Sequence, residues 1–270
     1  MKTGTSGAKI IAIARNTFGC FMRDKILLLI VAVLVCFFLL MTMPLIGLKA
    51  MRSTMPVEQY EKTVTSLVEM VSLLVSTCGS LLAVWAAADS VSSEMRSGTI
   101  LAVMARPVRR WEFLVGKFTA TVALMFVYVM GMLGTYYLLA WLGGGRVQCA
   151  PWILIVYPLA RYSLYAALAM LLVTMMHPAV VVALFWVLAT VGAMLSPAAH
   201  NDIPHWFRVV VYAVLPSAEL LSESRFFRLN QATLITWKDH VTTIAYGLDY
   251  TLVCFLLAIW SFRRRSLSRS

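Results

Sequence analysis

The stretch SSEMRSGTILAVMARPVRRWEFLVGK, residues 92–117, is the most polar part of a strongly apolar chain. It lies between two long hydrophobic runs and holds seven charged side chains, two glycines and a proline. Charged side chains are costly inside a bilayer, and proline ends or kinks a helix. The stretch therefore decides the fold, because one apolar helix must end before it and another must begin after it.

The composition of the rest of the chain indicates an integral membrane protein. Of 270 residues, 61% are hydrophobic and 13% are charged, whereas soluble domains have about 25% charged residues. A net charge of +11 could suggest a nucleic-acid partner in a soluble protein. Here the basic residues lie beside apolar runs, which favours contact with lipid headgroups. We expect an all-α membrane protein that binds no nucleic acid.

The apolar runs predict six transmembrane helices in a single transmembrane domain covering residues 1–270. A bilayer core about 30 Å thick needs about 20 helical residues. The first run is too long for the apolar part of a cleavable signal peptide, so we expect it to stay as an anchor. The predicted spans are Ile26–Leu48, Ser66–Ala88, Phe118–Leu142, Trp152–Met176, Pro178–Leu195 and Val241–Trp260.

The basic residues predict which side of the membrane each loop occupies. Of the 23 Lys and Arg, 14 lie in the N-terminal segment, residues 89–117 and the tail after Trp260. Only 8 lie in the loops on the opposite side. Cytoplasmic loops carry the excess of Lys and Arg. We therefore expect both termini and residues 89–117 in the cytoplasm, and the 196–240 loop outside it.

The segment AKIIAIARNTFGCFMRDK, residues 8–25, predicts an amphipathic helix before the first span. Ile10, Ile13, Thr17 and Phe21 recur at helical spacing, and polar or small residues occupy the other face. Such a helix with basic residues is suited to the inner headgroup region.

The 89–117 segment itself predicts a short cytoplasmic helix. The helix of the second span should continue to about Arg96, and Ser97 or Thr99 can cap a new helix that stops before Pro107. Its apolar patch has two alternative occupants, the lipid surface or a groove in a partner protein. The chain has no phosphate-binding loop of the GxxxxGK[ST] type, so it cannot drive transport alone. The patch comprises Ile100, Leu101, Val103 and Met104, rimmed by Arg106, Arg109 and Arg110.

The stretch DSVSSEMRSGTILAVMARPVRRWEFLVGKFTA, residues 89–120, resembles the signature of type-2 ABC transporter permeases, the membrane subunits of many ATP-driven exporters. Weaker similarity covers the rest of the chain. It includes the N-terminal "elbow" helix, Leu215-Pro216 in the last outer loop, and a Tyr-containing last span followed by Phe-Arg-Arg. The signature positions are Glu94, Gly98-Thr99, Ile100-Leu101, Pro107 with Arg109 or Arg110, and Gly116-Lys117.

The resemblance implies that the short helix couples the permease to a motor. It would sit in a cleft of a separate ATPase subunit, with two such subunits per complex, while ATP and Mg²⁺ are bound by those subunits and no cofactor by this chain. A second permease, identical or related, would complete an exporter in the inner cell membrane. The implied ATPase-coupling residues are Glu94, Gly98, Thr99, Ile100, Leu101, Met104, Pro107, Arg109, Arg110, Gly116 and Lys117.

The residues also bear on whether the chain is an enzyme. A membrane-embedded zinc protease would need an H-E-x-x-H motif, which the sequence lacks. It also lacks paired carboxylates at helical spacing within a span for acid–base chemistry. We therefore expect no enzymatic activity in this chain. A membrane-embedded enzyme of another kind, a channel or a scaffold without an ATPase partner is the alternative hypothesis.

Three charged residues within or near the spans are candidates for a polar substrate path. Arg161 falls inside the fourth span, and Asp249 or Glu69 could neutralise it. The alternative is that Arg161 and Asp249 extend to the outer headgroups. In the 196–240 loop, His200, Asp202 and His205 lie close together, but two histidines and one flexible carboxylate are common by chance, so no metal site is expected.

Overall fold

The structure is a computed structural model that describes residues 6–50, 55–96, 109–142, 150–194, 221 and 237–264. All the regular elements in these ranges are helices, as an all-α membrane protein requires. The helices are α1 (Ser6–Phe21), α2 (Lys25–Ala50), α3 (Val57–Arg96), α5 (Arg110–Leu142), α6 (Pro151–Val173), α7 (Pro178–Met194) and α10 (Trp237–Arg264).

The predicted apolar runs all coincide with helices. Among the described residues, α3, α5, α6 and α10 are long and apolar enough to cross a membrane. The described apolar part of α7, Pro178–Val187, is too short to be counted with these four helices. Membrane crossing by α2 and α7, and with it the count of six spans, stays a prediction.

The end of α3 at Arg96 confirms the predicted continuation of this helix beyond the second span, but α3 begins at Val57, nine residues before the predicted span. α6 ends at Val173, three residues before the predicted end of the fourth span. There the carbonyl of Leu172 accepts the N–H groups of both Met175 and Met176 at 2.9 and 2.8 Å. This turn closes the helix ahead of Pro178, whose ring disfavours helical geometry in the preceding residue.

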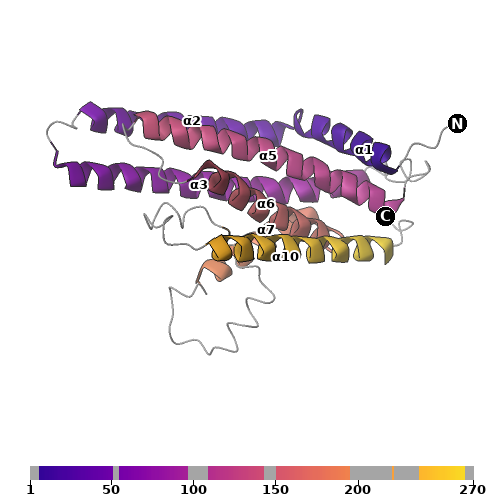
Figure 1. The fold of residues 1–270 in the computed structure, drawn as a ribbon. Helices are drawn as coiled ribbons and strands as arrows, with labels where there is room; N and C mark the ends of the chain where they lie inside the picture. Colours follow the sequence, from indigo (N-terminus) through magenta and orange to yellow (C-terminus); the bar gives the residue numbers. More distant parts are fainter. Residues whose placement is uncertain are drawn as a thin grey trace.

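The helices run along one long axis, and the start of α1 and the end of α10 lie at the same end of the bundle (Figure 1). α1 and α2 follow one another along α5, while α6 contacts α3, α5, α7 and α10. This arrangement makes α6 the central helix. It also places the end of α3, the start of α5, α1 and the end of α10 together.

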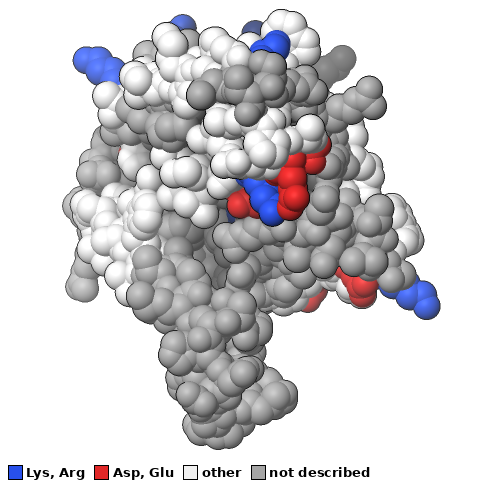
Figure 2. Space-filling model, turned by 90° about the vertical axis from the view of Figure 1, so that its left-hand side faces the viewer, with Lys and Arg blue, Asp and Glu red and all other residues white. Residues whose placement is uncertain are grey.

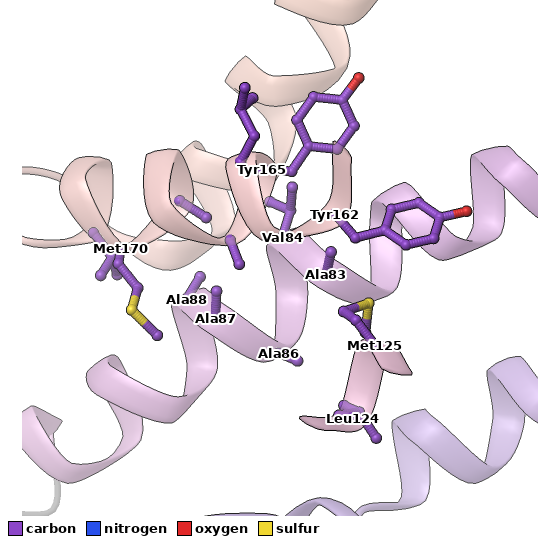
Figure 3. Packing of buried hydrophobic residues seen from close by; sticks show 14 of the residues in the cluster. Ala83, Val84, Ala86, Ala87, Ala88, Leu124, Met125, Tyr162, Tyr165 and Met170 are labelled. Carbon is purple, nitrogen blue, oxygen red and sulfur yellow. The ribbon is translucent and has the colours of Figure 1, made fainter. Parts of the chain in front are cut away.

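Small side chains allow α3 and α6 to approach closely (Figure 3). Four fully buried alanines of α3 share one buried cluster with Tyr162 and Met170 of α6 and with Met125 of α5. Helix association in a membrane depends on such close packing, because lipid tails are as apolar as the side chains. The alanines are Ala83, Ala86, Ala87 and Ala88.

The opposite end of the bundle, seen end-on in Figure 2, presents a mainly uncharged described surface with a few basic and acidic groups. On the first turns of α3, Lys62 Nζ and Glu58 Oε1 form an ion pair at a distance of 2.7 Å. Both side chains are highly exposed, so water screens the interaction.

Candidate coupling site at the ends of α3 and α5

The polar segment singled out in the sequence is bracketed by the end of α3 and the start of α5. Residues 97–108 lie outside the described ranges. Predictions for the following residues therefore fall outside the described structure: Gly98, Thr99, Ile100, Leu101, Met104 and Pro107. The described part is the base of this segment, which we define as residues 92–96 and 109–117.

An ion pair joins α3 to α5 at the base of the segment. Lys117 Nζ of α5 donates to Glu94 Oε1 of α3. The Lys117 side chain is 5% exposed and the Glu94 side chain 22%. Lys117 Nζ also lies 5.5 Å from the centre of the Phe113 ring. Because the lysine is buried, loss of its carboxylate partner would leave an uncompensated charge inside the bundle.

A second carboxylate, Glu112, fixes the first turn of α5. Its Oε2 accepts the backbone N–H of Arg109 at 2.8 Å, which is half of a capping box. The side chain of Ser6 at the start of α1 hydrogen-bonds to the same carboxyl group. Glu112 is 1% exposed. It therefore joins the beginnings of α1 and α5.

Gly116 lets α1 cross α5 at close range. A Cβ atom at this position would come within 2.7 Å of Ile13 Cγ2 and 3.2 Å of the Ile10 carbonyl. The predicted apolar face of the N-terminal helix thus packs on α5. Thr17 and Phe21 on the same helix are also buried.

Arg110 connects the base to the end of the chain. Its Nη1 donates to the carbonyl oxygens of Arg263 at 3.1 Å and Phe262 at 3.4 Å. One turn further along α5, the ring of Phe113 stacks on that of Phe262 with centroids 6.1 Å apart. The base of the segment, formed by the end of α3 and the start of α5, therefore also contacts α1 and α10.

Comparison with known families identifies the chain. A family model described as "ABC-2 family transporter protein" matches residues 11–267. The chain belongs to this family. No curated protein matches it significantly. As an ABC-2 family protein it is a multi-pass membrane component of a transporter, and the resemblance seen in residues 89–120 is confirmed at the level of the family.

The described members of the predicted coupling residues in this ABC-2 protein divide into three groups by exposure. Arg109 is exposed, whereas Gly116 and Lys117 are buried in the helix contacts of the base. Glu94 and Arg110 are partly buried and bonded to neighbouring helices. Glu112 and Phe262 were not singled out as site residues. A glutamate three positions after Arg109 is a capping signal that could have indicated Glu112, but nothing local to Phe262 indicates its contact with α5.

The contacts found between described residues do not join the three proposed substrate-path residues to one another. Arg161 is buried, and its Nη2 donates to Ser76 Oγ of α3 at 2.5 Å and to Tyr162 Oη at 3.2 Å. Asp249 is exposed on α10, and Glu69 is partly exposed on α3. The ion pairs found between described residues do not join Arg161 to either carboxylate. A substrate path through these three residues stays a prediction.

The described residues contain no group of three or more His, Cys, Asp or Glu side chains placed to bind a metal ion. The loop residues His200, Asp202 and His205 lie outside the described ranges.

Proposed function

We propose that this chain is the membrane-spanning permease subunit of an ATP-driven exporter, powered by separate ATPase subunits that bind residues 97–108. The family match supports a role in transport. The absence of a phosphate-binding loop from the sequence supports a separate motor. Two ATPase subunits and a second permease, identical or related, would complete the complex.

The observation that carries the coupling role is the Glu94–Lys117 pair. A segment that transmits force needs a base that does not yield when its tip is pushed. The pair joins the two helices that enter and leave the segment, and the buried capping carboxylate of Glu112 holds the first turn of α5. A displacement of residues 97–108 would therefore move α3 and α5 together.

The same reasoning suggests a part for Arg161. Its bond to Ser76 joins α6 to the long helix that leads into the segment. We propose that this cross-link keeps α6 in register with α3 when α3 moves. A path for a polar substrate beside Arg161 would use the same residues in another state of the permease.

The test of the function is purification of the tagged chain from its own cells in mild detergent. We expect an ATPase subunit to co-purify and the complex to hydrolyse Mg-ATP with inhibition by vanadate. Leu101→Glu should leave the amount of membrane-inserted permease unchanged and remove the ATPase, because a charge cannot enter an apolar cleft without a partner.

The matched control places the same charge at the other end of α3. Val57 is exposed at the first turn of that helix. Val57→Glu should retain the ATPase subunit. Normal ATPase recovery with Leu101→Glu, or a wild-type preparation without any ATPase, would contradict the proposal.

A further inference from the structure

Arg110 is one of the predicted ATPase-coupling residues, and its side chain contacts the C-terminal end of α10. A helix leaves its last four carbonyl groups without partners inside the helix. In α10, two of these carbonyls, those of Phe262 and Arg263, accept hydrogen bonds from the Arg110 guanidinium. A cation at this position also interacts favourably with the helix dipole. Arg110 therefore caps the C-terminal end of α10.

An apolar contact supports the polar one. Phe113 and Phe262 are each 1% exposed and stack with an interplanar angle of 16°. Both belong to the main buried cluster of the bundle. The contact therefore has two parts, a charged cap at the surface and a buried ring pair beneath it. Together they fix the end of α10 to the first turn of α5.

α10 is also fixed to α6 at two further levels. Near the capped end, a hydrogen bond of 2.9 Å joins the hydroxyls of Ser261 and Thr174. At the far end, Tyr157 Oη and His240 Nδ1 lie 2.8 Å apart, and both side chains are buried. The His240 ring packs against Trp152 with centroids 5.1 Å apart. His240 and Ser261 are 21 residues apart in α10, which is about 32 Å along the helix, so these contacts lie near its opposite ends.

We infer that α10 is a strut, that is, a rigid helix that transmits movement of residues 97–108 to α6 at the opposite face of the membrane. Arg110 is the positioning residue that attaches the end of α10 to α5. This inference rests on the proposed function for the source of the movement. The contacts of α10 with α5 and α6 lie within this chain and involve no ATPase subunit. Force on residues 97–108 would reach α10 within the first turn of α5 and would pass along α10 to the Tyr157–His240 contact.

The first experiment tests the attachment without any motor. Spin labels are placed on the exposed positions Thr119 of α5 and Leu257 of α10, in a chain whose five native cysteines are replaced by alanine. The purified wild-type permease should give one narrow distance distribution. Arg110→Ala should populate a displaced state about fivefold more, the change expected from loss of about one net hydrogen bond.

The second experiment tests transmission in the complex with its ATPase. ATP and vanadate should leave the Thr119–Leu257 distance unchanged in the wild type, because the two sites move together. With Arg110→Ala the same treatment should change this distance in the complexes that retain their ATPase subunits. Arg110→Lys should restore much of the wild-type behaviour, since an ammonium group can donate to the same carbonyls.

The matched control removes a neighbouring arginine. The Arg264 guanidinium lies 3.8 Å from the centre of the Trp260 ring on its own helix. Arg264→Ala should behave as wild type in both experiments. If the Thr119–Leu257 distance changes on trapping the wild-type complex, the strut is wrong although the permease function stands. If no complex with an ATPase exists, the function fails, and the first experiment still decides whether Arg110 attaches α10.

Discussion

At the scale of the residue, the base defined by residues 92–96 and 109–117 depends on charges that are shielded from water. Lys117 is almost fully buried and reaches a carboxylate 23 positions earlier in the chain. Burial makes the pair sensitive to the loss of one member, because the remaining charge is left in a poorly polar environment. The exposed Lys62–Glu58 pair provides the contrast, since water can solvate either partner alone.

Lys117→Met should lower the free energy of unfolding by about 2 kcal/mol, less than for a fully buried pair because Glu94 is partly exposed. Lys62→Met should change it by no more than about 0.5 kcal/mol. Denaturant titration of the purified permease in detergent measures both. The double variant Glu94→Gln with Lys117→Met should recover much of the loss. Equal effects of the two lysine substitutions would contradict the importance of the buried pair.

Several of these residues could be identified from the sequence, but which residues they contact could not. Glu94, Arg110, Gly116 and Lys117 stand out because they are polar or small beside apolar runs. The place of Arg110 at the ATPase interface stays a prediction, and its observed contact with α10, 153 residues further along the chain, was not predicted. Periodicity and capping signals report on neighbours within a few turns, so a contact across the whole chain leaves no local signal.

At the scale of the element, apolar runs predicted where helices form, and local sequence signals indicated the ends of α3 and α6 to within a few residues. The 40 residues of α3 exceed what a bilayer requires. The apolar face of α1 was predicted from its 3.6-residue period, but the headgroup region was expected to cover it. In the structure, Ile10 and Ile13 lie on α5 at Gly116, where the missing side chain makes room.

Gly116→Ala should loosen α1 from α5. The added methyl group would meet Ile13 and the Ile10 backbone, and overpacking of this kind costs about 1–3 kcal/mol. We expect a lower melting temperature and faster proteolysis after the exposed Arg15 of α1.

Gly131→Ala provides the control on the same helix, because a Cβ at Gly131 has no neighbour within 4 Å. Alanine is the better helix former, so this variant should be at least as stable as wild type. An unchanged melting temperature and cleavage rate in Gly116→Ala would show that α1 does not depend on the close approach.

At the scale of the whole molecule, both described ends of the chain lie at one end of the bundle (Figure 1). The end of α3, the start of α5 and the end of α10 meet there through side-chain contacts. The charge distribution in the sequence predicted this grouping, because the N-terminal segment, residues 89–117 and the tail hold most of the basic residues. The opposite end holds the aromatic contacts of His240 and the start of α3.

The orientation of this bundle in the membrane is the last prediction. Excess Lys and Arg favour the cytoplasm, so the end with Arg15 and Arg264 should face inward and the end with Val57 and Lys238 outward. All four positions are exposed and accept a single cysteine in a cysteine-free chain. A membrane-impermeant thiol reagent applied to intact cells should label Val57→Cys and Lys238→Cys. It should label Arg15→Cys and Arg264→Cys only after the membrane is permeabilised. The reverse pattern would place residues 97–108 on the side without ATP, where no ATP-driven motor could bind them.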